Sequence, residues 1–67
     1  MFSLVIPIFN EEKLIDELVS RTITAIESFT RDYEVIFVDD GSKDQSLSNI
    51  LQQREKNKRI KVLSLSK

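Results

Sequence analysis

The sequence contains no cysteine and no histidine. The absence of cysteine excludes disulfide bonds and thiolate metal sites, and the absence of histidine excludes histidine general bases and triads that contain histidine. Nearly all zinc chemistry is excluded with them. The single glycine, Gly41, also excludes the G-x-G-x-x-G dinucleotide turn and the Walker A loop, which need two or more glycines. These absences remove the most familiar catalytic and nucleotide-binding motifs.

The chain is also short and nearly neutral. At 67 residues and 7.8 kDa it is one small domain at most, near the size at which a single hydrophobic core barely offsets chain entropy. Its composition is 40% hydrophobic and 31% charged, and it has no apolar run long enough to span a membrane. The net charge of −1 argues against a polyanion partner. The composition is typical of a cytosolic globular segment.

The charges are unevenly distributed along the chain. Residues 1–42 carry three basic and nine acidic side chains, whereas residues 43–67 carry seven basic and two acidic ones. We interpret the basic cluster from Arg54 to Lys61 as the solvated end of a helix, where the helix dipole favours cations. The alternative is a patch that attracts phosphate or an anionic membrane surface. No aromatic residue interleaves this cluster, so we expect no nucleic-acid partner.

Three short apolar runs are typical of β-strands. They span residues 2–8, 33–38 and 60–65, and the first is apolar enough to be buried on both faces. Segments with helical periodicity separate them, so the order is β-α-β-α-β with connections just long enough for helical crossovers. The sequence therefore predicts a Rossmann-like α/β fold with a three-stranded parallel sheet in the order 3-2-1.

The two predicted helices are delimited by capping residues. The first is expected to begin at Asn10, as the N-cap, and to run to about Thr30. The second is expected to begin at a capping box formed by Ser42 and Gln45 and to stop near Asn57. Each helix would thus begin just beyond the carboxyl end of a strand.

The first strand is an unpaired edge in this predicted sheet. Whole proteins cover exposed apolar edges, because an open edge recruits another strand. We therefore expect residues 1–67 to be an incomplete domain. We also expect the isolated chain to form a homo-oligomer through the edge of the first strand.

Polar clusters follow the first two strands. Residues 7–12 (PIFNEE) and 39–42 (DDGS) lie beyond the carboxyl ends of parallel strands, where ligands bind in open α/β sheets. Because the two strands are neighbours, the clusters should face each other across one crevice. Carboxylates gathered there repel one another unless a cation or hydrogen-bond donors share them. Adjacent aspartates point in different directions, so we expect one to face the crevice and the other to stabilise the turn.

Segments 5–12 (VIPIFNEE) and 38–44 (VDDGSKD) closely resemble the opening of family 2 glycosyltransferases of the GT-A fold, which combine a P-x-[YF]-N-E strand end with a later D-D-G-S turn. The resemblance covers essentially the whole chain and is greatest to the dolichyl- and undecaprenyl-phosphate sugar synthases. It implies an enzyme on the cytoplasmic side that transfers a sugar from a UDP- or GDP-sugar to a polyprenyl phosphate or another glycan or lipid acceptor. Residues 1–67 would be its N-terminal nucleotide-binding portion.

The resemblance also implies a nucleotide site in this segment. Its residues would be Pro7, Ile8, Phe9, Glu11, Asp39 and Asp40. Main-chain groups at Pro7 and Ile8 would meet the base. Phe9, in place of the family's usual tyrosine, would stack on the base or pack beneath it, and Glu11 would accept from the ribose hydroxyls. The alternative for Phe9 is simple packing under the first helix. Asp40 would read a ring N–H of the base, while Asp39 would support the turn.

The parent enzyme of this resemblance uses a divalent metal, Mg²⁺ or Mn²⁺, held by a D-x-D motif that follows a fourth strand. That motif is absent from the sequence, as is an acceptor-side base, so no catalytic or metal-binding residue is assigned within residues 1–67. We expect the chain alone to be inactive. The alternative is a stand-alone, non-catalytic nucleotide-binding or assembly module. A phosphoacceptor domain is a further alternative, although it would add an aspartate and a lysine on later strands.

Overall fold

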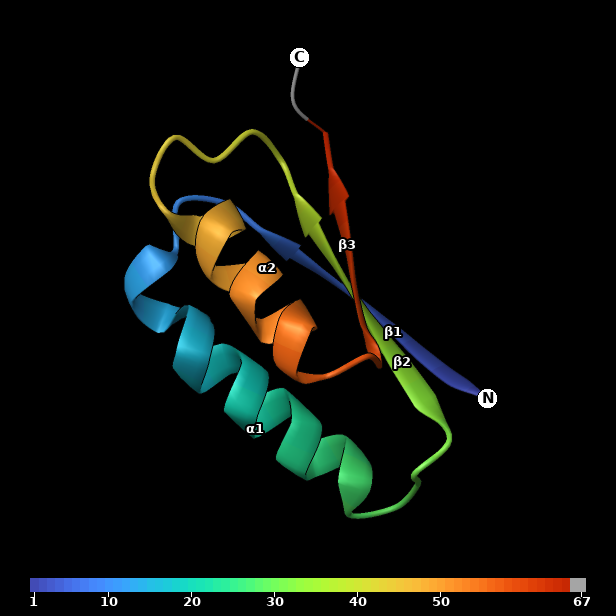
Figure 1. Cartoon of the computed structure of the whole chain (residues 1–67). Coiled ribbons are helices and arrows are strands. Elements are labelled where there is room, and N and C mark those ends of the chain that lie inside the picture. The colour runs from blue at the N-terminus through green and yellow to red at the C-terminus, as the bar shows by residue number, and fades with distance from the viewer. Residues whose placement is uncertain (66–67) are drawn as a thin grey trace.

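The computed structural model describes residues 1–65, so the last two residues of the expected segment 1–67 lie outside the described part (Figure 1). The elements are β1 (Phe2–Ile8), a 3-10 helix η1 (Glu12–Leu14), α1 (Ile15–Glu27), β2 (Tyr33–Asp39), α2 (Ser46–Lys56) and β3 (Ile60–Ser64). All three strands are parallel, and β2 lies between β1 and β3. The predicted α/β fold with a three-stranded parallel sheet is confirmed.

Both helices lie side by side on one face of the sheet (Figure 1). Two right-handed crossovers that proceed in the same direction across a parallel sheet place their helices on the same side. In β2 the side chains alternate between the two faces, and every second residue, beginning with Tyr33 and ending with Asp39, is buried. The buried face of the middle strand is thus the face that the two helices cover.

The hydrophobic core lies between the helices and the sheet. Its buried members are Ile8, Ile15, Val19, Ile26, Tyr33, Val35, Phe37, Ile50 and Ile60. Burial of each such side chain contributes about 1.5–3 kcal/mol relative to an exposed one. Ile15, Val19 and Ile26 come from α1 at helical spacing, as the periodicity predicts. The core therefore depends on residues from every strand and both α-helices.

The opposite face of the sheet is bare in the described part of the chain. Val5 is 58% exposed and Leu63 is 55% exposed, and Pro7 is exposed on the same face. The expectation that the first strand is buried on both faces is therefore wrong for this chain. The physical reason is that both helices cover the other side of the sheet.

The boundaries of α1 differ from the prediction. Asn10 is not its N-cap, because Leu14 occupies the position before the helix and Oδ1 of Asn10 accepts from the N–H of Lys43 in the other loop. The helix begins at Ile15 after the short 3-10 helix. It ends at Glu27, and the N–H of Thr30 closes the end by donating to the carbonyl of Ile26 at 3.0 Å.

The start of α2 also differs from the prediction. The helix begins at Ser46, and Ser42 does not form a capping box with Gln45, which has no side-chain capping bond among the described residues. Instead, Oδ1 of Asp44 accepts from the N–H of Ser46 at 2.9 Å. The hydroxyl of Ser42 accepts from the N–H of Asn10, 32 residues away. The long-range bond has replaced the local cap.

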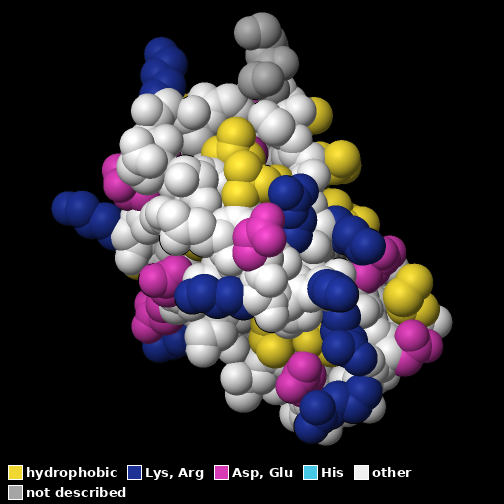
Figure 2. Space-filling model, viewed as in Figure 1, with side chains coloured by type: hydrophobic (Ala, Val, Ile, Leu, Met, Phe, Trp, Pro, Cys, Tyr) yellow, Lys and Arg dark blue, Asp and Glu magenta, His cyan; other side chains and the backbone are white. Residues whose placement is uncertain are grey.

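The basic cluster lies where α2 ends and β3 begins, and Figure 2 shows Lys and Arg side chains gathered there. Arg54 and Lys56 occupy the last turn of α2, in agreement with our interpretation of a solvated helix end. Arg59 is packed rather than free: its guanidinium lies 5.2 Å from the ring centre of Tyr33, and its Nε donates to the carbonyl of Arg31. None of the helices within residues 1–65 is long and apolar enough to cross a membrane.

β1 is an edge strand whose described neighbour is β2 alone. We therefore expect the chain to associate through the β1 edge, since unpaired backbone groups on an edge recruit another strand. Sedimentation at micromolar concentration should give a dimer or larger species. The substitution Val5→Lys should shift it toward monomer, because an edge lysine opposes pairing, whereas Val5→Thr should not. A folded wild-type monomer of 7.8 kDa would contradict this expectation.

The environment of Tyr33 predicts that the stability of the fold decreases at alkaline pH. Its side chain is 3% exposed and its hydroxyl donates to Oε2 of Glu27 at 2.7 Å. Burial, and then the hydrogen bond to Glu27, raise the pKa of the phenol. The folded state holds the phenol proton more tightly than the unfolded state does. Tyr33 therefore contributes its full stabilisation below the unfolded pKa of about 10, and this stabilisation is lost as the pH rises through the folded pKa.

We therefore expect the free energy of unfolding to decrease as the pH is raised above about 10. Tyr33→Phe should remove that part of the decrease and cost about 1 kcal/mol at neutral pH through the lost hydrogen bond. Denaturant unfolding of both proteins across the alkaline range measures the difference. Parallel curves for the two proteins would contradict the assignment to Tyr33.

Candidate functional site

The two predicted polar clusters lie side by side at the carboxyl edge of the sheet. Ile8 and Asp39, the last residues of β1 and β2, are register partners. Just beyond them, the N–H of Asp40 donates to the carbonyl of Ile8 at 3.2 Å. The loop after β1 and the loop after β2 therefore leave the sheet as neighbours, which confirms the predicted juxtaposition.

Asn10 joins the two loops by a reciprocal pair of hydrogen bonds. Its N–H donates to Oγ of Ser42 at 2.9 Å, and its Oδ1 accepts from the N–H of Lys43 at 2.8 Å. The left-handed backbone of Asn10 is one that asparagine tolerates better than most residues. One side chain thus fixes both the path of its own loop and its distance from the other.

The next two residues of the first loop are bound in the same way. The N–H of Glu11 donates to Oγ of Ser46 at 2.6 Å, and the N–H of Glu12 donates to Oδ2 of Asp44 at 3.2 Å. The side-chain amide of Asn49 donates to the carbonyl of Glu12 at 3.1 Å. Ser46 is completely buried, so its hydroxyl is part of the interior.

We call this set of cross-loop hydrogen bonds the loop clasp. It comprises Asn10, Glu11, Glu12, Ser42, Lys43, Asp44, Ser46 and Asn49. Backbone N–H groups that precede a helix lack intrahelical partners and must find others. In this chain, side chains from the second loop and from α2 supply them.

Asp44 is the acceptor at the centre of the loop clasp. Desolvation by partial burial opposes its ionisation, but hydrogen bonds from Ser46 and from the N–H of Glu12 outweigh it and lower the pKa of this carboxyl. Our sequence analysis did not single out Asp44 or Ser46. The signal that could have identified them is an aspartate two residues before a helix start, which typically accepts from the backbone N–H two residues on.

Phe9 and Ile8 differ in accessibility. The side chain of Ile8 is 1% exposed and belongs to the core, so this residue can meet a ligand only with its main chain. Phe9 is 53% exposed, which excludes the alternative that it packs beneath the first helix. Pro7 is exposed on the bare face of the sheet. The ring of Phe9 is therefore available for stacking.

Glu11 is half-buried at the start of the loop clasp. Its Oε1 accepts from the N–H of Phe9 at 3.4 Å, a long and weak bond. The carboxylate therefore lies back toward the backbone of Phe9, just beyond the end of β1.

The adjacent aspartates point in different directions, as expected. Asp40 is exposed, whereas Asp39 is 2% exposed and turned toward the side that the helices cover. Oδ2 of Asp39 accepts from the N–H of Ser42 at 3.3 Å, which is the contact of a residue that supports the turn. Its Oδ1 is buried and has no hydrogen-bond partner within residues 1–65. A buried carboxylate oxygen of this kind calls for a donor, such as water or a ligand.

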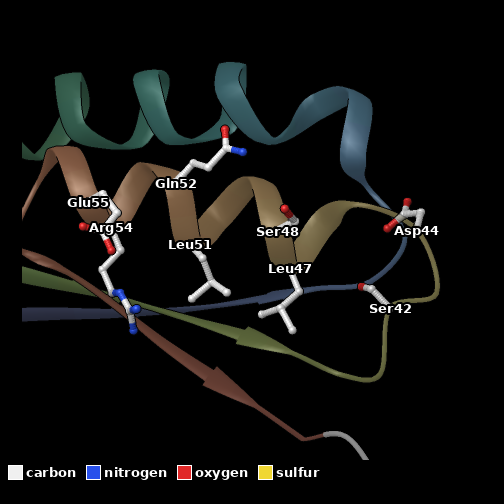
Figure 3. A pocket seen from close by; sticks show the side chains of 8 residues that line it. All are labelled: Ser42, Asp44, Leu47, Ser48, Leu51, Gln52, Arg54 and Glu55. Carbon is white, nitrogen blue, oxygen red and sulfur yellow. The ribbon is translucent and has the colours of Figure 1, made fainter.

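Two open pockets flank the loop clasp. The smaller, of about 430 Å³, is lined by residues 10–14 and Asp44, and so includes Glu11. The larger, of about 590 Å³, follows α2 (Figure 3). Leu47 and Leu51 extend into it from α2 toward the strands, and Ser42 and Asp44 lie at its loop end. None of the six predicted nucleotide residues lines this larger pocket.

The carboxylates of the site do not form a metal centre. Within the described residues, no group of three or more acidic side chains lies close enough together to hold a metal ion. Backbone N–H groups instead donate to the carboxylates of Asp44 and Asp39, and Oδ1 of Asp39 is left without a donor among the described residues. The site is therefore suited to accept hydrogen bonds from a ligand.

The comparison with protein families agrees with this architecture. The model of glycosyl transferase family 2 matches residues 3–67. The match includes both polar clusters, both α-helices and the three strands apart from Phe2 at the start of β1. The chain therefore belongs to glycosyl transferase family 2.

Proposed function

We propose that this chain is the nucleotide-recognition portion of a glycosyltransferase that transfers a sugar from a nucleotide-sugar donor. The observation that carries the proposal is the family match over residues 3–67, together with two polar loops bound to each other at the carboxyl edge of a parallel sheet. Ligands of open α/β sheets bind at this edge. Membership in the family supports a glycosyltransferase activity of the parent protein.

In this proposal the nucleotide is held by Pro7, Ile8, Phe9, Glu11, Asp39 and Asp40. Phe9 offers an exposed aromatic face, and stacking of a base on such a face contributes about 1–3 kcal/mol. Glu11, whose weak contact with the N–H of Phe9 is readily exchanged, accepts from the ribose hydroxyls. The strand ends at Pro7 and Ile8 contribute main-chain groups.

In this proposal Asp40 selects the base. A carboxylate is an acceptor only, so it favours a ring N–H, as in uracil and guanine, over the acceptor ring nitrogen of cytosine and adenine. Asp40 is exposed and reads this N–H. Asp39 supports the turn from the buried side through its bond with the N–H of Ser42. This chemistry supports a UDP- or GDP-sugar as the donor.

The acceptor in this proposal is a polyprenyl phosphate or another glycan or lipid, as in the dolichyl- and undecaprenyl-phosphate sugar synthases. The proposed enzyme uses Mg²⁺ or Mn²⁺, which stabilises the leaving nucleoside diphosphate. Because the described carboxylates form no metal centre, we place the metal ligands outside this chain and assign it no metal step. The role of the chain is to bind and orient the nucleoside.

We expect the 67-residue chain alone to release no nucleoside diphosphate from a UDP- or GDP-sugar. The reason is that the chain holds no metal ligand set among its described residues to stabilise the leaving group. The measurement is diphosphate release with Mn²⁺ or Mg²⁺ and a polyprenyl phosphate. Metal-dependent release above the level without protein would contradict the expectation.

We also expect weak binding of UDP or GDP by the chain, observable by ¹⁵N NMR titration, and no comparable binding of CDP. Asp40→Asn should weaken it by about 1–3 kcal/mol, because the amide presents a donor where an acceptor is needed. The matched control is Asp32→Asn, at an exposed carboxylate before β2, at the opposite end of that strand.

The same titration distinguishes the two aspartates of the turn. Equal affinity for wild type and Asp40→Asn would remove Asp40 from the site. If Asp39→Asn weakens binding in its place, then the buried aspartate reads the base. If CDP binds as tightly as UDP and GDP, the proposed selection by carboxylates is wrong.

A further inference from the structure

We infer that Asn10 is a positioning residue that holds the nucleotide-binding loop in its binding conformation before the ligand arrives. The inference rests on the proposed function. Asn10 lies between Phe9 and Glu11, the two side chains proposed to contact the base and the ribose. It uses both its N–H and its Oδ1 to bind the other loop.

Hydrophobic packing contributes little to fixing the loop between β1 and η1. Phe9 and Asn10 are both exposed, and the side-chain contact of Glu11 with the N–H of Phe9 is a long one, at 3.4 Å. Hydrophobic burial therefore does not determine the position of these side chains. The position of the loop is determined by two hydrogen bonds, one donated by the N–H of Asn10 to Ser42 and one accepted by its Oδ1 from the N–H of Lys43. These bonds tie the loop to the residues that directly follow Gly41.

The rest of the loop clasp supports the same position. Immediately after Asn10, the N–H groups of Glu11 and Glu12 are bound by Ser46 and Asp44. The lowered pKa of Asp44 keeps its carboxylate ionised, and an ionised carboxylate accepts both of its hydrogen bonds. Asn10 is thus the first of three consecutive residues whose N–H groups donate to side chains of the second loop or of α2. A loop ordered in this way loses less conformational entropy when the ligand binds.

Substitutions can separate two roles of Asn10, its left-handed backbone conformation and its Oδ1 acceptor. Asn10→Gly keeps access to a φ of 52° but removes the Oδ1 acceptor. Asn10→Asp keeps an acceptor oxygen and tolerates the same backbone. The matched control is Gln45→Ala, an exposed amide side chain of the second loop that does not cap α2 in the described structure.

The experiment is an NMR titration of the 67-residue chain and these variants with uridine and guanosine, with the Tm of each variant measured in parallel. These nucleosides are uncharged, so the added charge of Asn10→Asp does not repel them. Asn10→Gly should weaken affinity about threefold to tenfold, the factor that one lost hydrogen bond corresponds to. Its Tm should stay close to that of the wild type, and Asn10→Asp and Gln45→Ala should bind like the wild type.

The outcomes separate this inference from the proposed function. If the wild-type chain binds neither nucleoside, the proposed function is overturned and this inference with it. If the wild type binds and Asn10→Gly binds equally well, the inference alone is overturned. It is also overturned if Asn10→Asp fails to restore the affinity, or if the affinity of Asn10→Gly decreases only in proportion to a decrease in Tm.

Discussion

Backbone N–H groups at the start of a helix have no acceptor within the helix. This constraint determines how the two loops of this structure are joined. Asn10, Glu11 and Glu12 precede the first regular helix, and their N–H groups cannot be satisfied within it. They are satisfied by Ser42, Ser46 and Asp44, which begin the second crossover. The same bonds that complete the helix starts therefore also bring the two polar clusters together. The helix starts and the candidate site share one physical cause.

The fold could be predicted because its signals are local. Alternating apolar runs and helical periodicity identify strands and helices within short windows, and short crossovers leave few topologies. The helix starts could not be predicted in the same way. Serine and asparagine commonly cap helices, as Ser42 and Asn10 were expected to do. Each instead bonds to a residue 32 or 33 positions away, which no local pattern reveals. A long-range partner outcompeted the local one.

The candidate site also combines features that the sequence predicts with features that depend on the folded structure. The juxtaposition of the two loops follows from parallel neighbouring strands, and strand alternation predicts that Asp39 and Asp40 point apart. Which of the two is buried depends on which face the helices cover, and this is a property of the assembled sheet. Asp39 takes the inner position, where one oxygen supports the turn and the other lacks a partner within residues 1–65. The assignment of the base to Asp40 comes from the family resemblance, and the titration with Asp40→Asn and Asp39→Asn tests it.

Amide hydrogen exchange at Asn10, Glu11 and Glu12 tests the central claim most directly. The claim is that the two loops form one hydrogen-bonded unit in the absence of ligand. It predicts that these three amides exchange much more slowly than the same residues in an unstructured peptide, although they lie in a loop. It further predicts that Ser46→Ala accelerates exchange at Glu11, whereas Ser48→Ala does not. Exchange of all three amides at the rate of an unstructured peptide, in a chain whose β2 amides are protected, would contradict the account.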